Sequence, residues 1–409
     1  MSKIRVALLA PWMQSGGVET YLLRLARFLE QQQNIELEIV VTQEKGSWFE
    51  RIAEYGLQAR FIDGMHWTSP ARHMRRILRW LTDNPYDVIL INHDKLTQTI
   101  LPRLPERTVV IPVIHNDHEN IYSIAGMNHD AWNCAVTVSQ RLYQVASQRL
   151  PENSFCCIPH GVELPDAESL RRRQAFSHPL QLLFVGRLDH DQKGVLLLPD
   201  IIRRCHERGM QVHLAIAGIG GDEERLHSAC EHDREVSSRI RFYGEIPLTD
   251  AYNLMLNAHV LLFPSFFEGF GLTVVEAQGC GCVPVASRLP GTTDTTVKDG
   301  ITGLLVEPGD VEAMVDAIYT LYNDQDRWQR MSAAAHNHVA DHFSIEKMGQ
   351  AYLDLITDAM AGKYPLPCPR SADHVLDTSL LTPRDYRLIW PRDIERTLRR
   401  LLWGRFMHR

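Results

Sequence analysis

Short apolar runs rich in Val, Ile and Leu alternate with longer amphipathic segments along most of this chain, which limits the folds open to it. Apolar runs of this kind are typical of buried parallel strands, and the amphipathic segments between them are typical of crossover helices. The candidate strands form two series: Ile4–Ala10, Leu37–Thr42, Ala59–Ile62, Val88–Asn92, Val109–His115 and Ala135–Ser139, then Gln181–Gly186, Val212–Gly218, Ile240–Gly244, Val260–Ser265, Val283–Ala286 and Gly303–Val306. We therefore predict an α/β protein with two doubly wound parallel sheets.

The length of 409 residues and the hydrophobic content of 44% suit a chain with two domains, each able to bury its own core. A polar, charged stretch from Glu163 to His178 separates the two strand series, and we interpret it as the interdomain linker. The predicted domains are residues 1–165 and 175–343. A helix at 344–362 is predicted to cross back to the first domain, and 363–409 is predicted to be a tail.

Two glutamates, Glu268 and Glu276, occupy a segment that is predicted to run from strand to loop to helix. The helix is expected to begin at about Leu272, so that Glu268 lies in the loop and Glu276 about one turn inside the helix. Free backbone N–H groups and the positive dipole end of a helix favour phosphate, and Gly269 and Gly271 let the backbone approach a ligand closely. This pattern suits a sugar nucleotide, with carboxylates that accept hydrogen bonds from sugar hydroxyls. The open alternative is that Glu268 is an ordinary loop acid and Glu276 a solvated helix residue.

In a doubly wound domain, ligands bind at the carboxyl ends of the strands. Arg187 and Lys193 follow the first strand of the second series, where two cations match the needs of a diphosphate leaving group. Gly16 and Gly17 follow the first strand of the first series and open a helix, so their loop is able to pass close to a sugar or diphosphate. A tight turn without a ligand is the open alternative for this glycine pair.

His115 ends a strand of the first series, and an imidazole there is able to donate to a sugar hydroxyl or to stabilise developing positive charge. An ordinary core or surface histidine is the alternative, since the chain has 19 histidines. We interpret the carboxylates and histidines as lacking metal-ligand spacing. We predict that the protein needs no metal and no cofactor.

Several further motifs occur in order with those above, and they resemble one protein family. They are Ser15–Glu19, Ile158–Val162, Phe184–Leu188, Gln192–Gly194 and Ala217–Gly221. Together with the E-x7-E segment they are similar to the retaining, nucleotide-sugar-dependent glycosyltransferases of family 4, also called glycosyltransferase group 1. The resemblance spans about Met1 to Gly362. It implies the GT-B fold, in which two Rossmann-like domains face each other across a cleft.

The resemblance also implies roles for individual residues. Arg187 and Lys193 would contact the donor diphosphate, and Glu276 would bind the donor ribose. Glu268 would lie beside the sugar ring and its phosphate, while Gly269, Phe270, Gly271 and Leu272 would present backbone N–H groups to them. His115 would lie close to the reacting sugar, and Gly16 and Gly17 beneath the donor. His160 occupies a place where the family often has Asn, and we expect it to shape the chain rather than perform chemistry.

One segment departs from the family pattern. After Pro290-Gly291 the family commonly has a second glycine and then a glutamate, whereas this chain has Thr292-Thr293-Asp294-Thr295-Thr296. Asp294 would replace the glutamate only by a slip of one residue. Because this loop faces the donor in relatives, the departure leaves the identity of the donor sugar open.

The charge and cysteine content limit the functional classes. A net charge of −7 argues against a protein that binds nucleic acid as a whole. The eight cysteines lack C-x-x-C pairs, which predicts buried, reduced thiols in a cytoplasmic protein. No secretory signal is expected, because Ile4–Ala10 is interpreted as a strand, and no apolar run approaches the length of a membrane span.

The C-terminal tail has a different character from the rest of the chain. From Arg384 to Arg409 there are eight Arg against three acids, while Ile394, Leu398, Leu401, Leu402 and Phe406 follow helical spacing. Such a helix suits an anionic membrane surface, and the basic segment Arg72–Leu81 adds to this hypothesis. The alternative is that both helices pack their apolar stripes on the protein and solvate their arginines.

The sequence thus predicts a retaining, metal-independent hexosyltransferase. It would use a UDP- or GDP-sugar and a hydroxyl of a glycan or lipid-linked saccharide, in cell-surface polysaccharide or lipopolysaccharide synthesis, from the cytoplasm or at the inner face of its membrane. Met65–Trp67 and Asn116–Asn120 are loops positioned to line the acceptor side. The alternatives are a GT-B-type UDP-sugar 2-epimerase and a catalytically silent sugar-nucleotide-binding partner. A G-x-G-x-x-G dinucleotide motif is absent after the first strand.

Overall fold

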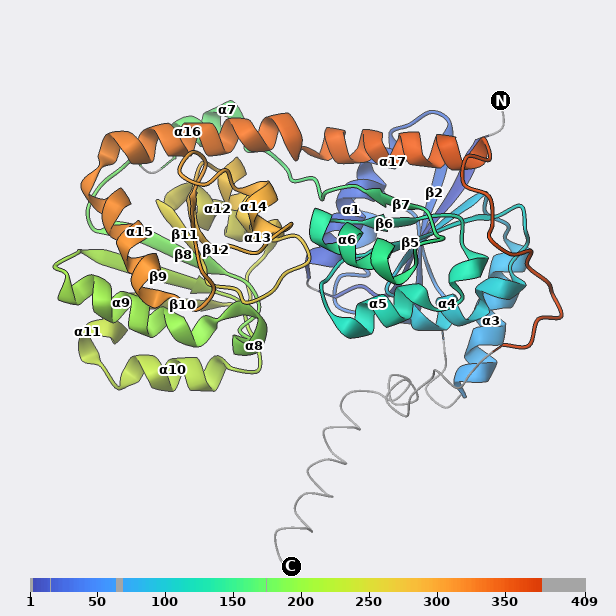
Figure 1. Ribbon diagram of the computed structural model, residues 1–409, viewed down its shortest axis with the longest axis horizontal. Coiled ribbons are helices and arrows are strands. Elements are labelled where there is room, and N and C mark those ends of the chain that lie inside the picture. Colours follow the sequence, from blue (N-terminus) through green and yellow to red (C-terminus); the bar gives the residue numbers. More distant parts are fainter. Residues whose placement is uncertain (1–2, 15, 64–68, 174, 377–409) are drawn as a thin grey trace, which may run out of the picture. The chain divides into compact units, whose positions relative to one another are not determined.

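A computed structural model of the protein describes residues 3–14, 16–63, 69–173 and 175–376 (Figure 1). The chain divides into two compact units. The first runs to Thr137, includes Val145–Cys156 and resumes at Gly349. The second comprises Val138–Gln144 and Cys157–Met348. The stretch 163–178, interpreted above as a linker, belongs to the second unit, and the predicted domain boundaries stay a prediction.

The first unit contains a seven-stranded sheet with the order β3-β2-β1-β4-β5-β6-β7. Its strands are β1 (Ile4–Trp12), β2 (Ile35–Glu44), β3 (Ala59–Phe61), β4 (Val88–Asn92), β5 (Val109–Ile114), β6 (Ala135–Thr137) and β7 (Phe155–Cys157). The pairs from β3 to β6 are parallel. Strand β1 pairs with β2 on one side and β4 on the other, so the direction of winding reverses between β1 and β4.

The second unit contains a six-stranded parallel sheet with the order β10-β9-β8-β11-β12-β13. Its strands are β8 (Leu180–Val185), β9 (Val212–Ala217), β10 (Ile240–Gly244), β11 (Val260–Phe263), β12 (Val283–Ser287) and β13 (Leu304–Val306). Here the winding reverses between β8 and β11. The doubly wound α/β class predicted from the alternation of apolar runs is confirmed, because both sheets have this arrangement.

Helices cover the sheets as the amphipathic segments predict (Figure 1). Those whose residues belong wholly to the first unit are α1 (Gly17–Glu30), α2 (Arg51–Glu54), α3 (Pro70–Asp83), α4 (Lys95–Ile100) and α5 (Glu119–Gly126). Those of the second are α7 (Ala167–Arg171), α8 (His190–Lys193), α9 (Leu198–Glu207), α10 (Glu223–Glu231), α11 (Arg234–Ser237), α12 (Leu248–Asn257), α13 (Leu272–Gly279), α14 (Thr293–Thr296), α15 (Val311–Asn323) and α16 (Gln325–His342). Helices α6 (Gln140–Arg149) and α17 (Ile345–Met360) each contribute residues to both units.

Each predicted strand coincides with an observed one, but the sequence analysis missed β7. This strand has only three residues, Phe155, Cys156 and Cys157, and all three are half-buried at the end of the first sheet. A short strand at an edge need not carry a long apolar run, so no pattern revealed it. The prediction that the thiols are buried is accordingly wrong for Cys156, Cys157 and the exposed Cys368, whereas the other five cysteines are buried. None of the eight, all of which lie in the described ranges, forms a disulfide.

Helix α17 packs tightly against α1 within the first unit. The hydroxyl of Tyr21 donates to that of Tyr352 at 2.8 Å, and both side chains are buried. Burial raises the pKa of Tyr21 well above its ordinary value. Gly349 lies directly on the ring of Phe28, where a Cβ would overlap ring atoms. Glycine at this point therefore permits the close approach of the two helices.

The chain after α17 lies against the first unit as an extended strap, residues 361–376. Arg370 is buried and donates to the carbonyl oxygens of Pro105, Thr108 and Ala131. Burial lowers the pKa of its guanidinium to about 10. Cys368 N donates to Asp130 O at 3.1 Å. These bonds anchor the strap, and the basic tail that follows lies outside the described residues.

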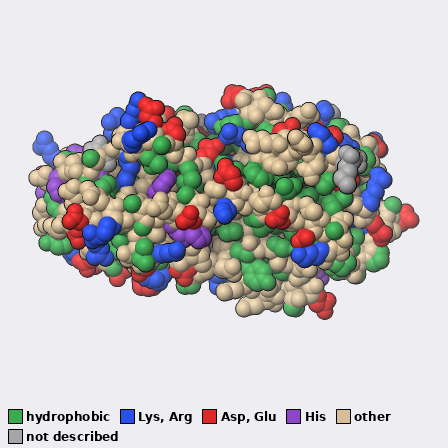
Figure 2. All heavy atoms as spheres, turned by 90° about the horizontal axis from the view of Figure 1, so that it is seen from above, with side chains coloured by type: hydrophobic (Ala, Val, Ile, Leu, Met, Phe, Trp, Pro, Cys, Tyr) green, Lys and Arg blue, Asp and Glu red, His purple; other side chains and the backbone are tan. Residues whose placement is uncertain are grey.

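The surface mixes charges of both signs. On the face drawn in Figure 2, acidic and basic side chains are interspersed. Surface ion pairs such as Arg149–Glu119 and Arg208–Glu312 follow from this mixture. None of the helices in the described ranges combines the length and the apolar character that crossing a membrane requires.

We predict that Gly349→Ala lowers the free energy of unfolding by about 1–3 kcal/mol, because overpacking against Phe28 outweighs the gain of roughly 1 kcal/mol in helix propensity. Urea unfolding followed by circular dichroism measures the change. The control is Gly126→Ala in α5, where a Cβ meets only Leu150 at 3.8 Å. Equal stability of the two variants would contradict the proposed close approach of α17 and α1.

Candidate functional site

The second sheet brings four predicted site residues to the point where its winding reverses. In doubly wound sheets the crevice for a ligand lies outside the carboxyl ends of the strands at this point. Arg187 and Lys193 follow β8, and Glu268 follows β11, which pairs directly with β8. Glu276 lies in α13, the helix that leads away from β11. The topology therefore gathers these side chains, although they are far apart in the sequence.

Lys193 and Glu268 form an ion pair with 2.6 Å between Nζ and Oε1. The side chains are only 17% and 7% exposed, so the two charges compensate each other out of bulk water. The residue after Lys193 is a glycine, and this lets the loop of Lys193 lie close to the segment that carries Glu268. Gly194 has φ 65° and lies directly on the carbonyl of Pro264, which leaves no room for a Cβ. An ammonium group has three N–H donors, so Lys193 is able to donate further hydrogen bonds besides the one to Glu268.

Two further side chains hold the Glu268 carboxylate, and sequence reasoning had assigned neither a role. The hydroxyl of Ser265 donates to Glu268 Oε1 at 2.7 Å, and Gln192 Nε2 donates to Oε2 at 3.5 Å. The backbone N–H of Phe266 also donates to the carbonyl of Gln192 at 2.8 Å. Both residues stand inside quoted motifs, but only the packed loops show that they face the same carboxylate.

Helix α13 begins at the predicted place and carries no side-chain cap. Gly271 is its N-cap residue with φ 82°, a left-handed conformation that favours glycine. The first turn contains no acidic residue, so the positive end of the dipole is not neutralised there. Gly269, Phe270 and Leu272 flank this end, and Glu276 is buried within the helix. The helix end is thus suited to an anionic group.

The side chain of Phe270 is buried in an aromatic cluster. Its ring meets His160 edge-on with the centroids 5.3 Å apart, and Phe343 with the centroids 5.9 Å apart. Gly161, next to His160, lies against the backbone of Ser344 and Ile345. This packing is in keeping with the expectation that His160 shapes the chain. Arg187, in contrast, is exposed at the end of β8.

The segment that departs from the family pattern forms the short helix α14. Asp294 Oδ1 accepts a hydrogen bond from Gly291 N at 2.7 Å, so this carboxylate closes its own turn. Gly291 O in turn accepts from Arg141 N at 2.9 Å. The side chains of Thr292, Thr293 and Thr296 are buried. The donor role considered for Asp294 stays a prediction.

The first sheet gathers a second set of predicted residues at its own reversal point. Gly16 is the N-cap of α1 and Gly17 its first residue, in the segment that follows β1. His115 follows β5 and is buried, with its Nε2 2.9 Å from Asn92 Oδ1. The neighbouring Asp94 is fully buried and accepts from Thr42 and Thr97 hydroxyls, each at 2.6 Å. The sequence did not single out Asn92 and Asp94 as site residues, because polar residues are common at strand ends.

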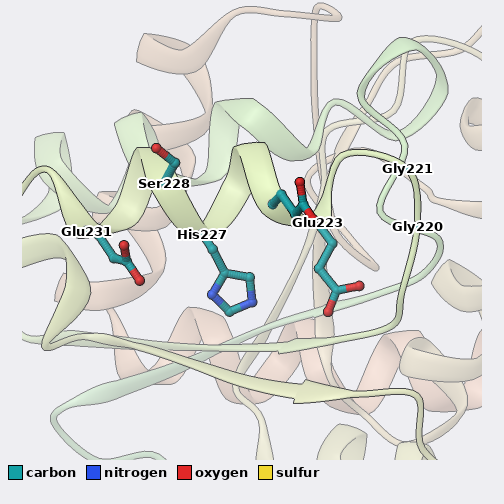
Figure 3. A pocket seen from close by; sticks show the side chains of 7 residues that line it. Gly220, Gly221, Glu223, His227, Ser228 and Glu231 are labelled. Carbon is teal, nitrogen blue, oxygen red and sulfur yellow. The ribbon is translucent and has the colours of Figure 1, made fainter. Parts of the chain in front are cut away.

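A pocket of about 680 Å³ in the second unit contains none of the predicted site residues. It is lined by Gly220, Gly221, Glu223, Glu224, His227, Ser228 and Glu231, and Figure 3 shows most of these side chains along α10. Its three glutamates would repel a diphosphate, so we do not assign the donor to it. No cluster of three or more potential metal ligands occurs among the described residues.

The two switch-point sites on two doubly wound sheets define a protein of the GT-B glycosyltransferase class. Family models agree: "Glycosyl transferases group 1" matches residues 166–338, and "Glycosyltransferase Family 4" matches residues 15–165. The chain belongs to this family, as the motif resemblance predicted.

Curated relatives and solved structures are consistent with this assignment. The chain is 29% identical to a D-inositol 3-phosphate glycosyltransferase of Thermobifida fusca over 49% of its own length and 48% of the relative's. It is 28% identical to a phosphatidyl-myo-inositol mannosyltransferase of Mycobacterium leprae over 65% of its length and 72% of the relative's. The chain thus spans about half the length of the first of these relatives.

Two solved structures share the fold. Anabaena HepE, in complex with UDP and glucose, has a TM-score of 0.71 at 17% identity, with 87% of this chain and 100% of that chain covered. The pneumococcal O-GlcNAc transferase GtfA has a TM-score of 0.74 at 13% identity, with 88% and 99% covered. At these identities the likeness shows the fold alone.

We predict that Ser265→Ala lowers the free energy of unfolding by about 1–3 kcal/mol, because the buried Glu268 carboxylate loses a charge-assisted hydrogen bond. The matched control is Ser287→Ala on β12. Ser287 is equally buried, but its hydroxyl has no partner among the described residues, so its loss is expected to cost little. Chemical denaturation of the two variants measures the difference, and equal effects would show that the Ser265 bond contributes nothing.

Proposed function

We propose that this protein is a retaining glycosyltransferase that transfers a hexose from a UDP- or GDP-sugar to a hydroxyl group of a glycan or a lipid-linked saccharide. The observation that carries the proposal is the Lys193–Glu268 pair beside the uncapped positive end of α13. Membership of the glycosyltransferase family supports it. So do the titles of fold neighbours, which name UDP with glucose and UDP with GlcNAc.

In this proposal the donor diphosphate binds at the reversal point of the second sheet. Negative charge grows on the phosphate as its bond to the anomeric carbon breaks. Arg187, Lys193 and the backbone N–H groups of Gly269–Leu272 would stabilise that charge more in the transition state than in the ground state. Because fixed cations and a helix end supply the positive charge, we propose that transfer needs no divalent metal and no cofactor.

The two glutamates have separate tasks in this mechanism. Glu276, inside α13, accepts hydrogen bonds from the ribose hydroxyls of the donor. Glu268 lies beside the sugar ring and orients it, while its bond to Lys193 keeps the cation in position for the phosphate. We do not propose a covalent intermediate on Glu268. His115, Gly16 and Gly17 contribute the sugar-facing surface of the first unit.

The acceptor is proposed from chemistry and from relatives together. Two curated relatives carry names of inositol-linked acceptors, D-inositol 3-phosphate and phosphatidyl-myo-inositol. Both acceptors present hydroxyl groups on a polar ring, as glycans and lipid-linked saccharides do. We propose a polyhydroxylated acceptor of this kind, with cell-surface polysaccharide or lipopolysaccharide synthesis as the process. Of the predicted acceptor loops, Met65–Trp67 lies outside the described residues.

Two other functions would use the same donor site. A UDP-sugar 2-epimerase would change the sugar without an acceptor, and a silent partner would bind the sugar nucleotide without turnover. Release of nucleoside diphosphate only when acceptor is present distinguishes the transferase from both. The anomeric configuration of the product, measured by NMR, tests retention.

We expect one series of nucleotide sugars to raise the melting temperature, by an amount that corresponds to about 2.7 kcal/mol at a ligand concentration of 100 Kd. A panel of UDP-, GDP-, ADP- and TDP-sugars, screened with and without EDTA, measures this shift. Glu276→Ala is expected to abolish it, because the ribose loses its acceptor.

The control for this panel is Glu224→Ala, an exposed glutamate of α10 that removes the same charge away from the site. It is expected to keep the full shift. A shift that vanishes with EDTA would overturn metal independence. No shift with any nucleotide sugar would count against the donor site itself.

We also propose that the first unit approaches an anionic membrane surface at the inner face of the cytoplasmic membrane. Helix α3 buries Met74, Ile77 and Leu81 in the core, so its apolar stripe does pack on the protein. Arg72, Arg75 and Arg79 remain exposed. Its contribution would therefore be electrostatic, beside that of the basic tail.

Replacing Arg72, Arg75 and Arg79 together by Gln is expected to weaken binding to anionic vesicles by about 3 kcal/mol, since each arginine near such a surface contributes about 1 kcal/mol. Co-sedimentation at low and raised salt measures binding, which salt should screen. The matched control replaces the exposed Arg225, Arg234 and Arg241 of the second unit. Absence of binding by the wild type at low salt would refute the proposal.

A further inference from the structure

The loop that follows β9 lies directly on the segment that follows β8. A Cβ on Gly218 would overlap the carbonyl oxygen of Gly186, and a Cβ on Gly220 would overlap the carbonyl group of Leu188. Figure 3 shows Gly220 and Gly221 in the loop that leads into α10. The backbones of the two loops are therefore in contact at the carboxyl ends of the strands, where the donor site is proposed.

Hydrogen bonds join the two loops. Leu188 N donates to Ile219 O at 3.0 Å, and Asp222 N donates to Leu188 O, also at 3.0 Å. The carboxylate of Asp222 adds a third bond, because its Oδ2 accepts the backbone N–H of His190 at 2.7 Å. Asp222 thus contacts the segment Leu188–His190 through both its backbone and its side chain.

The side chain of Asp222 does not cap its own helix. Asp222 is the N-cap residue of α10, a position where an aspartate usually accepts a hydrogen bond from the first turn, but it makes no such bond. Its carboxylate bonds instead to His190 and to Arg225. The N–H of His190 is the main cause that lowers the pKa of Asp222, so this acid is charged at neutral pH. Helix capping therefore does not explain an aspartate at this position.

The segment that Asp222 holds lies between the two cations of the proposed donor site. Arg187 directly precedes it, and Lys193 ends the short helix α8, which begins at His190. The far end of α8 is fixed by the ion pair between Lys193 and Glu268. Because α8 has four residues and thus about one turn, a shift of its start at His190 changes where Lys193 lies.

Two carboxylates occupy the start of α8 and direct an anionic ligand to its other end. Asp222 accepts from His190 N, and Asp189 Oδ1 accepts from Gln192 N at 3.2 Å. Negative charge at this point neutralises the positive end of the helical turn and repels phosphate. A diphosphate is attracted instead to Lys193 and to the uncapped start of α13.

We propose that Asp222 is a positioning residue of the donor site, whose carboxylate holds the segment Leu188–His190 and thereby sets where Arg187 and Lys193 meet the donor diphosphate. The ligand part of this inference rests on the proposed function. Asp222 itself acts through the two cations and touches no substrate. It lies one residue beyond the motif Ala217–Gly221, so motif order did not single it out.

The anchoring bond is tested without any ligand, by amide hydrogen exchange of the full-length protein. Asp222→Ala removes the acceptor of the His190 N–H, so exchange in the peptide that covers residues 188–193 is expected to rise about tenfold. Asp222→Asn keeps an acceptor oxygen and is expected to restore most of the protection. Exchange in Asp222→Ala equal to that of the wild type would overturn the inference.

The matched control is Asp233→Ala in the same unit. Asp233 is the N-cap of α11, is half-buried like Asp222, and accepts from Glu235 N at 2.9 Å and from Val236 N at 3.3 Å. Because α11 precedes β10, Asp233 lies at the amino ends of the strands, away from the proposed donor site. The control removes the same charge and is expected to leave exchange of residues 188–193 unchanged. An equal rise in both variants would show a general loosening of the unit and count against an anchor at Asp222.

The role in the donor site is tested by calorimetric titration with UDP and GDP, and with uridine and guanosine, which lack the diphosphate. Asp222→Ala is expected to weaken binding of the preferred diphosphate about tenfold, because the cations are no longer held in place. Binding of the corresponding nucleoside is expected to stay unchanged, whereas a merely structural role would weaken both ligands alike. Asp222→Asn is expected to restore most of the lost affinity.

The outcomes separate this inference from the proposed function. A wild type that binds UDP or GDP, with Asp222→Ala at wild-type affinity or weakened equally for the nucleoside, would overturn the positioning role and leave the donor site intact. A wild type that binds neither diphosphate would overturn the proposed function and the ligand part of this inference with it. The exchange measurements would still decide whether Asp222 holds the loop.

Discussion

The ion pair between Lys193 and Glu268 is the interaction on which the second unit's site depends. It joins the loop after β8 to the loop after β11, the two strands between which the winding reverses. Breaking a buried pair of this kind typically costs about 3–5 kcal/mol, because one charge is left without compensation. Ser265 and Gln192 add hydrogen bonds to the same carboxylate. The pair therefore helps to hold the two loops together, beside the backbone bond from Phe266 N to Gln192 O.

The first unit also joins the ends of neighbouring strands through polar side chains. Asn92, His93 and His115 stand at the ends of adjacent strands and form hydrogen bonds with one another. Helix α17 supports them from behind through Tyr352 and Tyr21.

Local sequence patterns predicted much of the fold. The apolar runs predicted every strand except β7, and the glycine loop before Leu272 predicted the beginning of α13 at the correct residue. Burial was predicted less well. Cysteine is usually a core residue, but Cys156 and Cys157 lie on the edge strand β7 and Cys368 is exposed. Arg370, a long charged residue in the tail region, is instead buried, which no composition rule would suggest.

The sequence by itself determined the class of the fold, the family and the list of candidate residues, because periodicity, glycine turns and motif order are local properties of the chain. Only the tertiary structure decided which side chains share a partner. Ser265 and Gln192 became relevant because folding brings their loops to one carboxylate, and Asp222 because its loop lies on the segment that follows β8. Which donors and acceptors meet depends on packing between residues distant in the chain.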